Sequence, residues 1–419
     1  MTPPRPSRRL LAVVAAALAL ASDGRRSPDR VDPRRDVVLV LVDTLRADHL
    51  GVAGHAARDA TPGLDRLARQ GAWFRDAHSA APWTPPSTRS LLTSLDPAVH
   101  GLDRHAGEYA TTIPGLPERL QTLAQLLGRS GYRTCAVTGG GGVSRSYGLD
   151  RGFESWYEPE KVTGIDVAGG VDRALAWLDA VPAGERTFLF LHTYEVHLPN
   201  THHLFAAEEK GDDAARAAAA YDGDLAFADR ELGRFFRGLE ERGRFQRSLV
   251  VVTSDHGENL FDRVLAGRGV EHGHHLHGEL TRVPLVFVAP GLVPPRGPLA
   301  GTVSLLDVVP TVLSLVGAAR PPYPLQGRDL RRVLQGLEAP DADRTVFSGN
   351  PLQGPGWRSA RTARGVLIVA PPVRGNEWWH AVDVPAEASY DLSRNAGEQD
   401  GGGGLPPEER DVLLQRLAD

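Results

Sequence analysis

The feature that most constrains the fold is a run of six consecutive apolar residues, VVLVLV at 37–42, which ends at Asp43. A strand with one face in water alternates apolar and polar residues, whereas a strand covered on both faces is apolar throughout. Comparable runs follow at 132–139, 187–194, 248–255 and 283–290. Stretches with helical spacing separate them, the longest at 212–242. This alternation predicts an α/β fold with a large, mostly parallel sheet flanked by helices.

Two of the expected helices have recognisable ends. Thr61-Pro62 places a capping residue before a proline at the first helical position, and Gly71 is a suitable stop. The stretch PGLPERLQTLAQLLGRSG predicts a longer helix over 114–131.

The N-terminus has the layout of a signal peptide. Arg5, Arg8 and Arg9 precede an apolar run that ends in small residues at 19–21. We expect a signal peptide over 1–21, a polar linker over 22–35 and export to the periplasm or beyond. The alternative is an uncleaved N-terminal anchor. No other segment is long and apolar enough to cross a membrane, so no membrane embedding is expected beyond the leader.

The character of the sequence changes near Thr345. Short strands are predicted in 357–371, 377–384 and 388–393, and a closing helix in 406–419. We therefore divide the mature chain into a catalytic α/β domain over 36–344 and a small C-terminal α+β subdomain over 345–419.

Charge and cysteine content exclude several classes of protein. The formal net charge is −5 and no basic run follows the leader, which argues against nucleic acid as a partner. Cys135 is the only cysteine, so the chain has no internal disulfide and no cysteine-based metal cage.

Polar residues follow three of the buried strands at the point where each strand ends. They are Asp43 after the first, Tyr194, Glu195 and His197 after another, and Asp255 and His256 after a third. A single aspartate at a strand end is usually a turn or capping residue. Carboxylates at several parallel strand ends would share one crevice and repel each other unless a divalent cation lay between them. Aspartate together with histidine suits Mg, Mn, Ca or Zn.

The stretch SAAPWTPPSTRSLLTS at 79–94 places Thr84 at the mouth of a short helix. The backbone donors of Ser87 and Thr88 and the helix dipole would face an anion there. A hydroxyl bound to a metal loses its proton more easily and can attack phosphorus or sulfur. The alternative is that Thr84 only caps the helix.

The ordered set of motifs resembles the sulfatase family of the alkaline phosphatase superfamily, over nearly all of the mature chain. The motifs are VLVLVDTLRADHLG, TPGLDRLARQGAWFRDAHS, PPSTRSLLTSLDPAVHG, VVVTSDHGE, HGHHLHGELTRVPLVF, VSLLDVVPTVLSLVG and GRDL. The resemblance implies an alkaline phosphatase-like fold, one divalent metal ion and ester hydrolysis.

Residue roles follow from the same resemblance. The positions that match the family's metal ligands are Asp43, Asp255 and His256, with Thr84 in the place of the nucleophile beside the metal. His197 matches a histidine at the transferred group or leaving oxygen. His272 lies where relatives hold the anion, with His274 as the substitute, and Arg89 corresponds to the family's active-site arginine.

The sequence departs from the family pattern in ways that bear on chemistry. Sulfatases that form formylglycine carry Cys or Ser in Cys-x-Pro-Ser-Arg, whereas this chain reads Thr-Pro-Pro-Ser-Thr-Arg, so no formylglycine is expected. Arg89 comes one residue late, which turns it about 100° further around the helix. Thr44 replaces a second aspartate, and His256 replaces the usual asparagine. Asp-His with a threonine nucleophile resembles phosphodiesterases, phosphonate monoester hydrolases and phosphoglycerol or phosphoethanolamine transferases.

We therefore expect a metal-dependent hydrolase that cleaves a sulfate or phosphate ester through Thr84, with phosphoester favoured on chemical grounds. The substrate would be a small-molecule, glycan or lipid ester. A transferase to an acceptor alcohol and a non-catalytic binding protein are the alternatives.

Overall fold

The structure is a computed structural model. It describes residues 31–102, 115–159, 166–205, 211–265, 268–349, 352, 356–370, 387–399 and 403–418. The predicted signal peptide, most of the predicted linker and the predicted strand at 377–384 lie outside these residues.

The centre of the molecule is an eight-stranded sheet with the order β10-β2-β9-β6-β1-β5-β3-β4. Its strands are β1 (Asp36–Val42), β2 (Ala72–His78), β3 (Tyr132–Val137), β4 (Ser155–Tyr157), β5 (Arg186–Thr193), β6 (Ser248–Thr253), β9 (Arg282–Val288) and β10 (Arg296–Ser304). Only β9 runs antiparallel to its neighbours, β6 and β2. The predicted large, mostly parallel sheet is confirmed.

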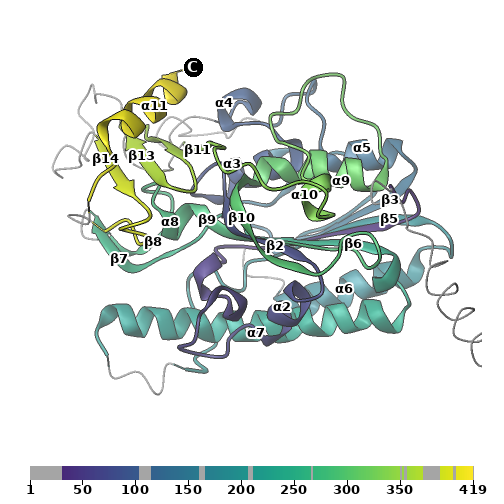
Figure 1. The fold of residues 1–419 in the computed structure, drawn as a ribbon. Helices are drawn as coiled ribbons and strands as arrows, with labels where there is room; N and C mark the ends of the chain where they lie inside the picture. The colour runs from purple at the N-terminus through teal and green to yellow at the C-terminus, as the bar shows by residue number, and fades with distance from the viewer. Residues whose placement is uncertain are drawn as a thin grey trace, which may run out of the picture.

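Helices cover both faces of this sheet (Figure 1). One layer holds α2 (Pro62–Ala68), α6 (Val167–Ala180) and α7 (Asp213–Glu241), and the other holds α3 (Thr84–Thr93), α5 (Leu123–Arg129), α9 (Val308–Val316) and α10 (Arg331–Leu334). The shorter helical segments are α4 (Pro97–His100), α8 (Gly278–Thr281) and the 3₁₀ turns Ala47–His49, Gly51–Ala53, Arg145–Tyr147, Phe245–Arg247 and Leu305–Asp307.

The two helical layers explain the uninterrupted apolar run of β1. Val37, Leu39 and Leu41 belong to the core beneath one layer, and the alternate residues Val38, Val40 and Val42 belong to the core beneath the other. Because successive side chains of a strand point to opposite faces, a strand between two layers must be apolar at every position.

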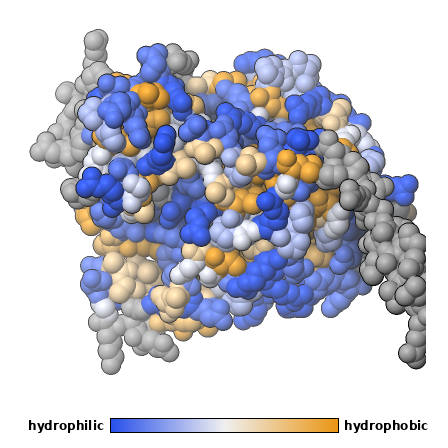
Figure 2. Space-filling view, in the orientation of Figure 1, coloured by the Kyte–Doolittle hydropathy of each residue, from blue (hydrophilic) through white to orange (hydrophobic). Residues whose placement is uncertain are grey.

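The helix expected over 212–242 is confirmed as α7. Asp212 caps it, because the side chain accepts a hydrogen bond from the Ala215 N–H at 3.0 Å. The lower right of the surface, where the C-terminal half of this helix lies, is largely hydrophilic (Figure 2), as expected for a helix with one apolar face. Among the described residues, no helix is both long and apolar enough to span a bilayer.

The prediction of a long helix over 114–131 is wrong in its first half. Helix α5 covers only Leu123–Arg129, because Thr122 and Gln125 form a capping box that starts the helix there. The shorter helix α2 begins at Pro62 as expected, but the Thr61 hydroxyl accepts from the Gly51 N–H instead of capping.

A second, antiparallel sheet follows the large one, with the order β11-β12-β13-β14. Its strands are β11 (Val346–Gly349), β12 (Arg358–Arg361), β13 (Gly365–Val369) and β14 (Glu387–Asp391). The predicted closing helix is α11 (Pro407–Ala418), and its Leu413 packs with Ala360, Leu367 and Leu405. A hairpin of β7 (Asn259–Leu265) and β8 (Arg268–Glu271) lies near this smaller sheet (Figure 1).

Candidate functional site

Asp43, Asp255 and His256 meet at one edge of the large sheet. They follow β1 and β6, which are paired in parallel register. The Nε2 atom of His256 lies 3.5 Å from Oδ2 of Asp255 and 3.8 Å from Oδ1 of Asp43. All three side chains are buried, and their possible ligand atoms lie within 4.8 Å of one another. The expectation that these strand ends bring their polar side chains together holds for the three residues.

Thr84 enters the same group from the opposite side. It is the first residue of α3, and its Oγ1 lies 3.2 Å from Oδ2 of Asp43 and 3.2 Å from Nε2 of His256. The residue that precedes the helix is Trp83, which makes no side-chain capping bond. The alternative that Thr84 serves as a helix cap is therefore not what the structure shows.

The prediction that the backbone N–H groups of Ser87 and Thr88 face an anion beside Thr84 is wrong. The Ser87 N–H donates to the Trp83 carbonyl at 3.4 Å. Thr88 lies inside the helix, where its amide pairs four residues back. The side chain of Ser87 does have a role, since its hydroxyl donates to the Asp255 carbonyl at 2.6 Å and ties α3 to the end of β6.

The charges of this group fit a divalent cation. Oδ1 of Asp43 and Oδ2 of Asp255 are buried and have no hydrogen-bond partner. Burial alone would raise the pKa of Asp43, but the imidazole of His192 close to its carboxylate and the charge of the nearby histidines hold it below its usual value. Burial and the Asp43 charge raise the pKa of Asp255 well above its usual value. Two such carboxylates cannot both ionise comfortably without a cation between them.

His256 is prepared as a neutral ligand. Its Nδ1 lies 2.8 Å from the Gly257 carbonyl, which fixes the proton on that nitrogen and leaves Nε2 facing the carboxylates. Burial, aided by the charge of His272, lowers the pKa of His256 to about 3. Two carboxylates, one imidazole and the Thr84 hydroxyl form a donor set that suits a hard or borderline divalent ion.

Two more histidines stand beside this set, as expected. The ring of His272 lies 4.4 Å from that of His256 and 4.9 Å from that of His197, centroid to centroid. Nδ1 of His272 contacts Oε2 of Glu258 at 3.1 Å, and Nδ1 of His197 contacts the Leu198 carbonyl at 2.6 Å. Each ring therefore keeps Nε2 for a ligand. Burial would lower the pKa of His272, but Glu258 outweighs it and raises the value to about 9.

Three other sequence candidates have different contacts. Arg89 donates from Nη2 to the Tyr147 carbonyl at 2.9 Å. Glu195 binds the Val167 N–H and His202, and the His274 ring packs on His275. The hydroxyl of Thr84 is instead bonded to Asp43 and His256. The one-residue shift of Arg89 along α3 explains its different direction.

Sequence reasoning missed His192 and Gly142 beside the site, whereas it had named Tyr194 among the polar residues at the strand ends. Nε2 of His192 lies 3.5 Å from Oδ2 of Asp43, and its Nδ1 accepts from the Gly139 N–H at 3.2 Å. The Tyr194 hydroxyl accepts from the Gly142 N–H at 2.9 Å. A side chain on Gly142 would meet Cβ of Thr84 at 2.8 Å, so the glycine-rich loop must pass against the threonine. The available signal was His192, a polar residue inside the apolar run TFLFLHT.

A sequence model of the Sulfatase family matches residues 35–318. The chain belongs to the sulfatase family. It is therefore a sulfatase-family hydrolase, and members of this family are typically metal-dependent, which agrees with the ligand set at Asp43.

Individual relatives are distant but cover most of the chain. N-acetylgalactosamine-6-sulfatase of Canis lupus familiaris is 26% identical over 82% of this chain and 73% of its own length. A structure solved with its substrate D-glucosamine-2-N,6-O-disulfate superimposes with a TM-score of 0.73, at 16% identity over 92% of this chain and 97% of that one. Phosphonate monoester hydrolase of Agrobacterium radiobacter gives a TM-score of 0.71, at 17% identity over 92% of this chain and 94% of its own.

Proposed function

We propose that this sulfatase-family hydrolase uses Thr84 as its nucleophile and cleaves phosphate or phosphonate esters in preference to sulfate esters. The observation that carries the proposal is the position of Oγ1 of Thr84, 3.2 Å from both Oδ2 of Asp43 and Nε2 of His256. A hydroxyl that only stabilised the fold would have no reason to lie among the donor atoms of a metal site.

The chain's own residues would divide the work as follows. Asp43 accepts the Thr84 hydroxyl proton in a hydrogen bond and directs the oxygen toward the crevice. His272, a cation at neutral pH beside Glu258, would hold the negative charge of the ester. His197 or His272 would give a proton from Nε2 to the leaving oxygen. A divalent cation bound by Asp43, Asp255 and His256 would supply Lewis-acid polarisation and favour the deprotonated hydroxyl.

The preference for phosphorus follows from how the covalent intermediate is released. A formylglycine hydrate can expel sulfate by re-forming its aldehyde, whereas a threonine ester has no such exit. Water must then attack the transferred atom itself, which is far easier at the phosphorus of a phosphothreonine than at the sulfur of a sulfothreonine. The fold is shared with a phosphonate monoester hydrolase as well as with proteins that bind sulfated sugars, so it admits either chemistry and the preference rests on the nucleophile.

The experiment compares turnover of p-nitrophenyl phosphate, bis-p-nitrophenyl phosphate, p-nitrophenyl phenylphosphonate and p-nitrophenyl sulfate at one defined metal concentration. We expect the phosphorus esters to dominate, and Thr84→Ala to lose at least about 10³-fold in kcat while it keeps its metal. Thr93→Val, on the same helix, is the matched control and should retain turnover. Dominant sulfate cleavage, or full activity of Thr84→Ala, would refute the proposal.

Two other functions remain as outcomes of this assay. A transferase would release p-nitrophenol faster when an acceptor alcohol is added. A binding protein would show no turnover with any ester, but the retained carboxylates and His256 argue against it.

We further propose that the leader at 1–21 exports the chain, which N-terminal sequencing of the secreted protein would test. A glycan or lipid ester is the natural substrate class that we propose.

A further inference from the structure

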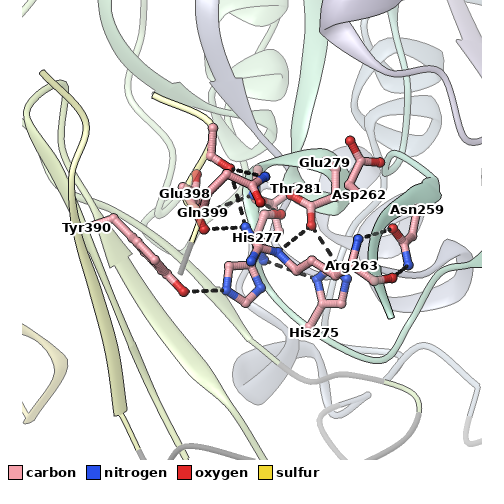
Figure 3. Close-up of polar contacts among 12 residues, drawn as sticks. Asn259, Asp262, Arg263, His275, His277, Glu279, Thr281, Tyr390, Glu398 and Gln399 are labelled. Carbon is pink, nitrogen blue, oxygen red and sulfur yellow. Dashed lines mark hydrogen bonds and ion pairs between the residues drawn. The ribbon is translucent and has the colours of Figure 1, made fainter. Parts of the chain in front are cut away.

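We propose that His275, His277 and Glu279 form a second divalent-metal site, separate from the set at Asp43, Asp255 and His256. The three residues lie in the segment HLHGE before β9, and all three side chains are buried. Their possible ligand atoms lie within 4.8 Å of one another (Figure 3). The proposed function does not use any of these residues.

The ring of His275 supplies the strongest indication. Its Nε2 is fully buried, has no hydrogen-bond partner and lies 3.7 Å from Oε1 of Glu279. The other ring nitrogen, Nδ1, faces the backbone N–H of His277 at 3.4 Å. A buried polar atom without a partner is costly, so it calls for a ligand that the protein atoms do not provide.

The other two side chains are already oriented by outer contacts. Nε2 of His277 lies 3.2 Å from the Tyr390 hydroxyl (Figure 3), so Nδ1 is the ring atom that we assign to the metal. Oε1 of Glu279 accepts from Nε of Arg263 at 2.7 Å. Metal-binding histidines and carboxylates usually have such outer partners, which fix the tautomer and the direction of the ligand. The positive charge of Arg263 will lower the affinity for a cation without removing a donor atom.

The donor set indicates the kind of metal. Two imidazole nitrogens and one carboxylate are the ligands of zinc and of similar borderline ions, not of Ca²⁺ or Mg²⁺, which prefer oxygen. Ligand atoms around tetrahedral zinc are on the order of 3.3 Å apart. Small side-chain rotations within this cluster would therefore be enough to enclose an ion.

The position of the cluster suggests what the ion would do. The His277 ring packs edge-on against Tyr390 of β14 and against Trp357, the residue before β12. The Gly278 N–H donates to Oε2 of Glu398, and Arg263 donates to the Glu398 carbonyl. An ion held here would tie the segment before β9 to the residues that contact the C-terminal sheet, so the site would be structural.

The test uses the full chain with Asp43→Asn and Asp255→Asn, which disables the first site. After the metal is stripped, Co²⁺ and Zn²⁺ are titrated separately. We expect one bound ion, the visible absorption of Co²⁺ with nitrogen ligands, and a Tm higher by about 3 °C or more with Zn²⁺. Adding His275→Gln should abolish all three signals. His203→Gln, a change at an exposed histidine, is the matched control and should leave them intact.

The result that would overturn the proposal is a folded double variant that binds no ion, or one that binds an ion equally well after His275→Gln. Circular dichroism checks that each variant is folded. If His275→Gln does not fold, Glu279→Gln keeps the shape of the side chain and removes its charge, and it must weaken Co²⁺ binding at least tenfold. Unchanged binding in that variant would also refute the site.

Discussion

Nδ1 of His272 lies 3.1 Å from Oε2 of Glu258, and the other carboxylate oxygen of Glu258 is buried without a partner. Glu258 comes two residues after His256, so one short segment supplies a ligand candidate and the carboxylate that orients the neighbouring histidine. The pair sets both the direction and the charge of His272.

We therefore expect Glu258→Gln to lower kcat about 10- to 100-fold, the range found when an outer partner of a site histidine is lost. The amide preserves the shape but removes the negative charge, so metal content should stay within error of the unchanged protein. The measurements are steady-state kinetics with p-nitrophenyl phosphate and metal analysis of the same sample. Unchanged kcat would show that His272 does not need its partner.

Asp255→Asn should lower metal content and turnover together, because it removes one of two carboxylates that face His256 at close range. Asp229→Asn is a suitable control, since Asp229 is also a buried carboxylate but binds the Gly63 and Leu64 N–H groups at the start of α2. Metal analysis after dialysis at low free metal distinguishes the two. Equal metal retention in both variants would contradict the assignment of Asp255 as a ligand.

Acid should destabilise the fold partly through His100. Burial, with help from the charge of Arg89, lowers the pKa of His100 to about 3, below the usual value near 6.5. The unfolded chain therefore binds a proton at His100 more readily than the folded chain does. The stability that neutral His100 contributes is complete above pH 6.5 and is lost as the pH falls toward 3. Between pH 7 and pH 5 the loss from this residue is about 2 kcal/mol.

Urea denaturation at pH 7 and pH 5 measures this effect. In His100→Gln the free energy of unfolding should change less between the two pH values than in the unchanged protein. Other buried histidines titrate in both proteins, so their contribution cancels in the difference. An equal loss of stability in the two proteins would mean that His100 is not held neutral in the fold.

The ion pair of Asp307 and Arg344 should be important for stability. Nη1 and Nη2 of Arg344 contact the two carboxylate oxygens at 2.6 and 2.7 Å, and both side chains are buried. Asp307→Ala leaves the guanidinium buried without its counter-charge and should cost about 3–5 kcal/mol in unfolding free energy. Asp341→Ala, which breaks an exposed ion pair with Arg328, should have little effect on the unfolding free energy. Thermal melts of the two variants measure this difference.

The sequence predicted those parts of the fold that local patterns determine. The uninterrupted apolar strands and the capped helix α7 were recognisable, because burial on both faces and a 3.6-residue period leave direct signals. Strands β2 and β10 were not recognised, since polar residues interrupt their sequences AWFRDAH and RGPLAGTVS; β10 is an edge strand of the sheet and β2 lies next to it. Helix α5 was expected too long because the helical pattern extended beyond the Thr122 cap.

The site shows the same division. Residues at strand ends could be placed together from topology alone, and Thr84 from its helix. The directions of side chains could not: Arg89 was expected at the site and contacts Tyr147, while His192 was overlooked and lies beside Asp43. Those outcomes depend on rotamers and on contacts between segments distant in sequence, which no local pattern encodes.

The central position of β1 has a consequence for how the protein is made. Its partners in the sheet are β5 and β6, and β6 follows about 200 residues later in the chain. The ribosome adds about 5–20 residues per second, so β6 is synthesised roughly 10 to 40 s after VVLVLV. An apolar, uncharged, strand-forming segment of this kind is prone to aggregate while it is unpaired. We expect the yield of folded protein to depend on chaperones that protect this segment during synthesis.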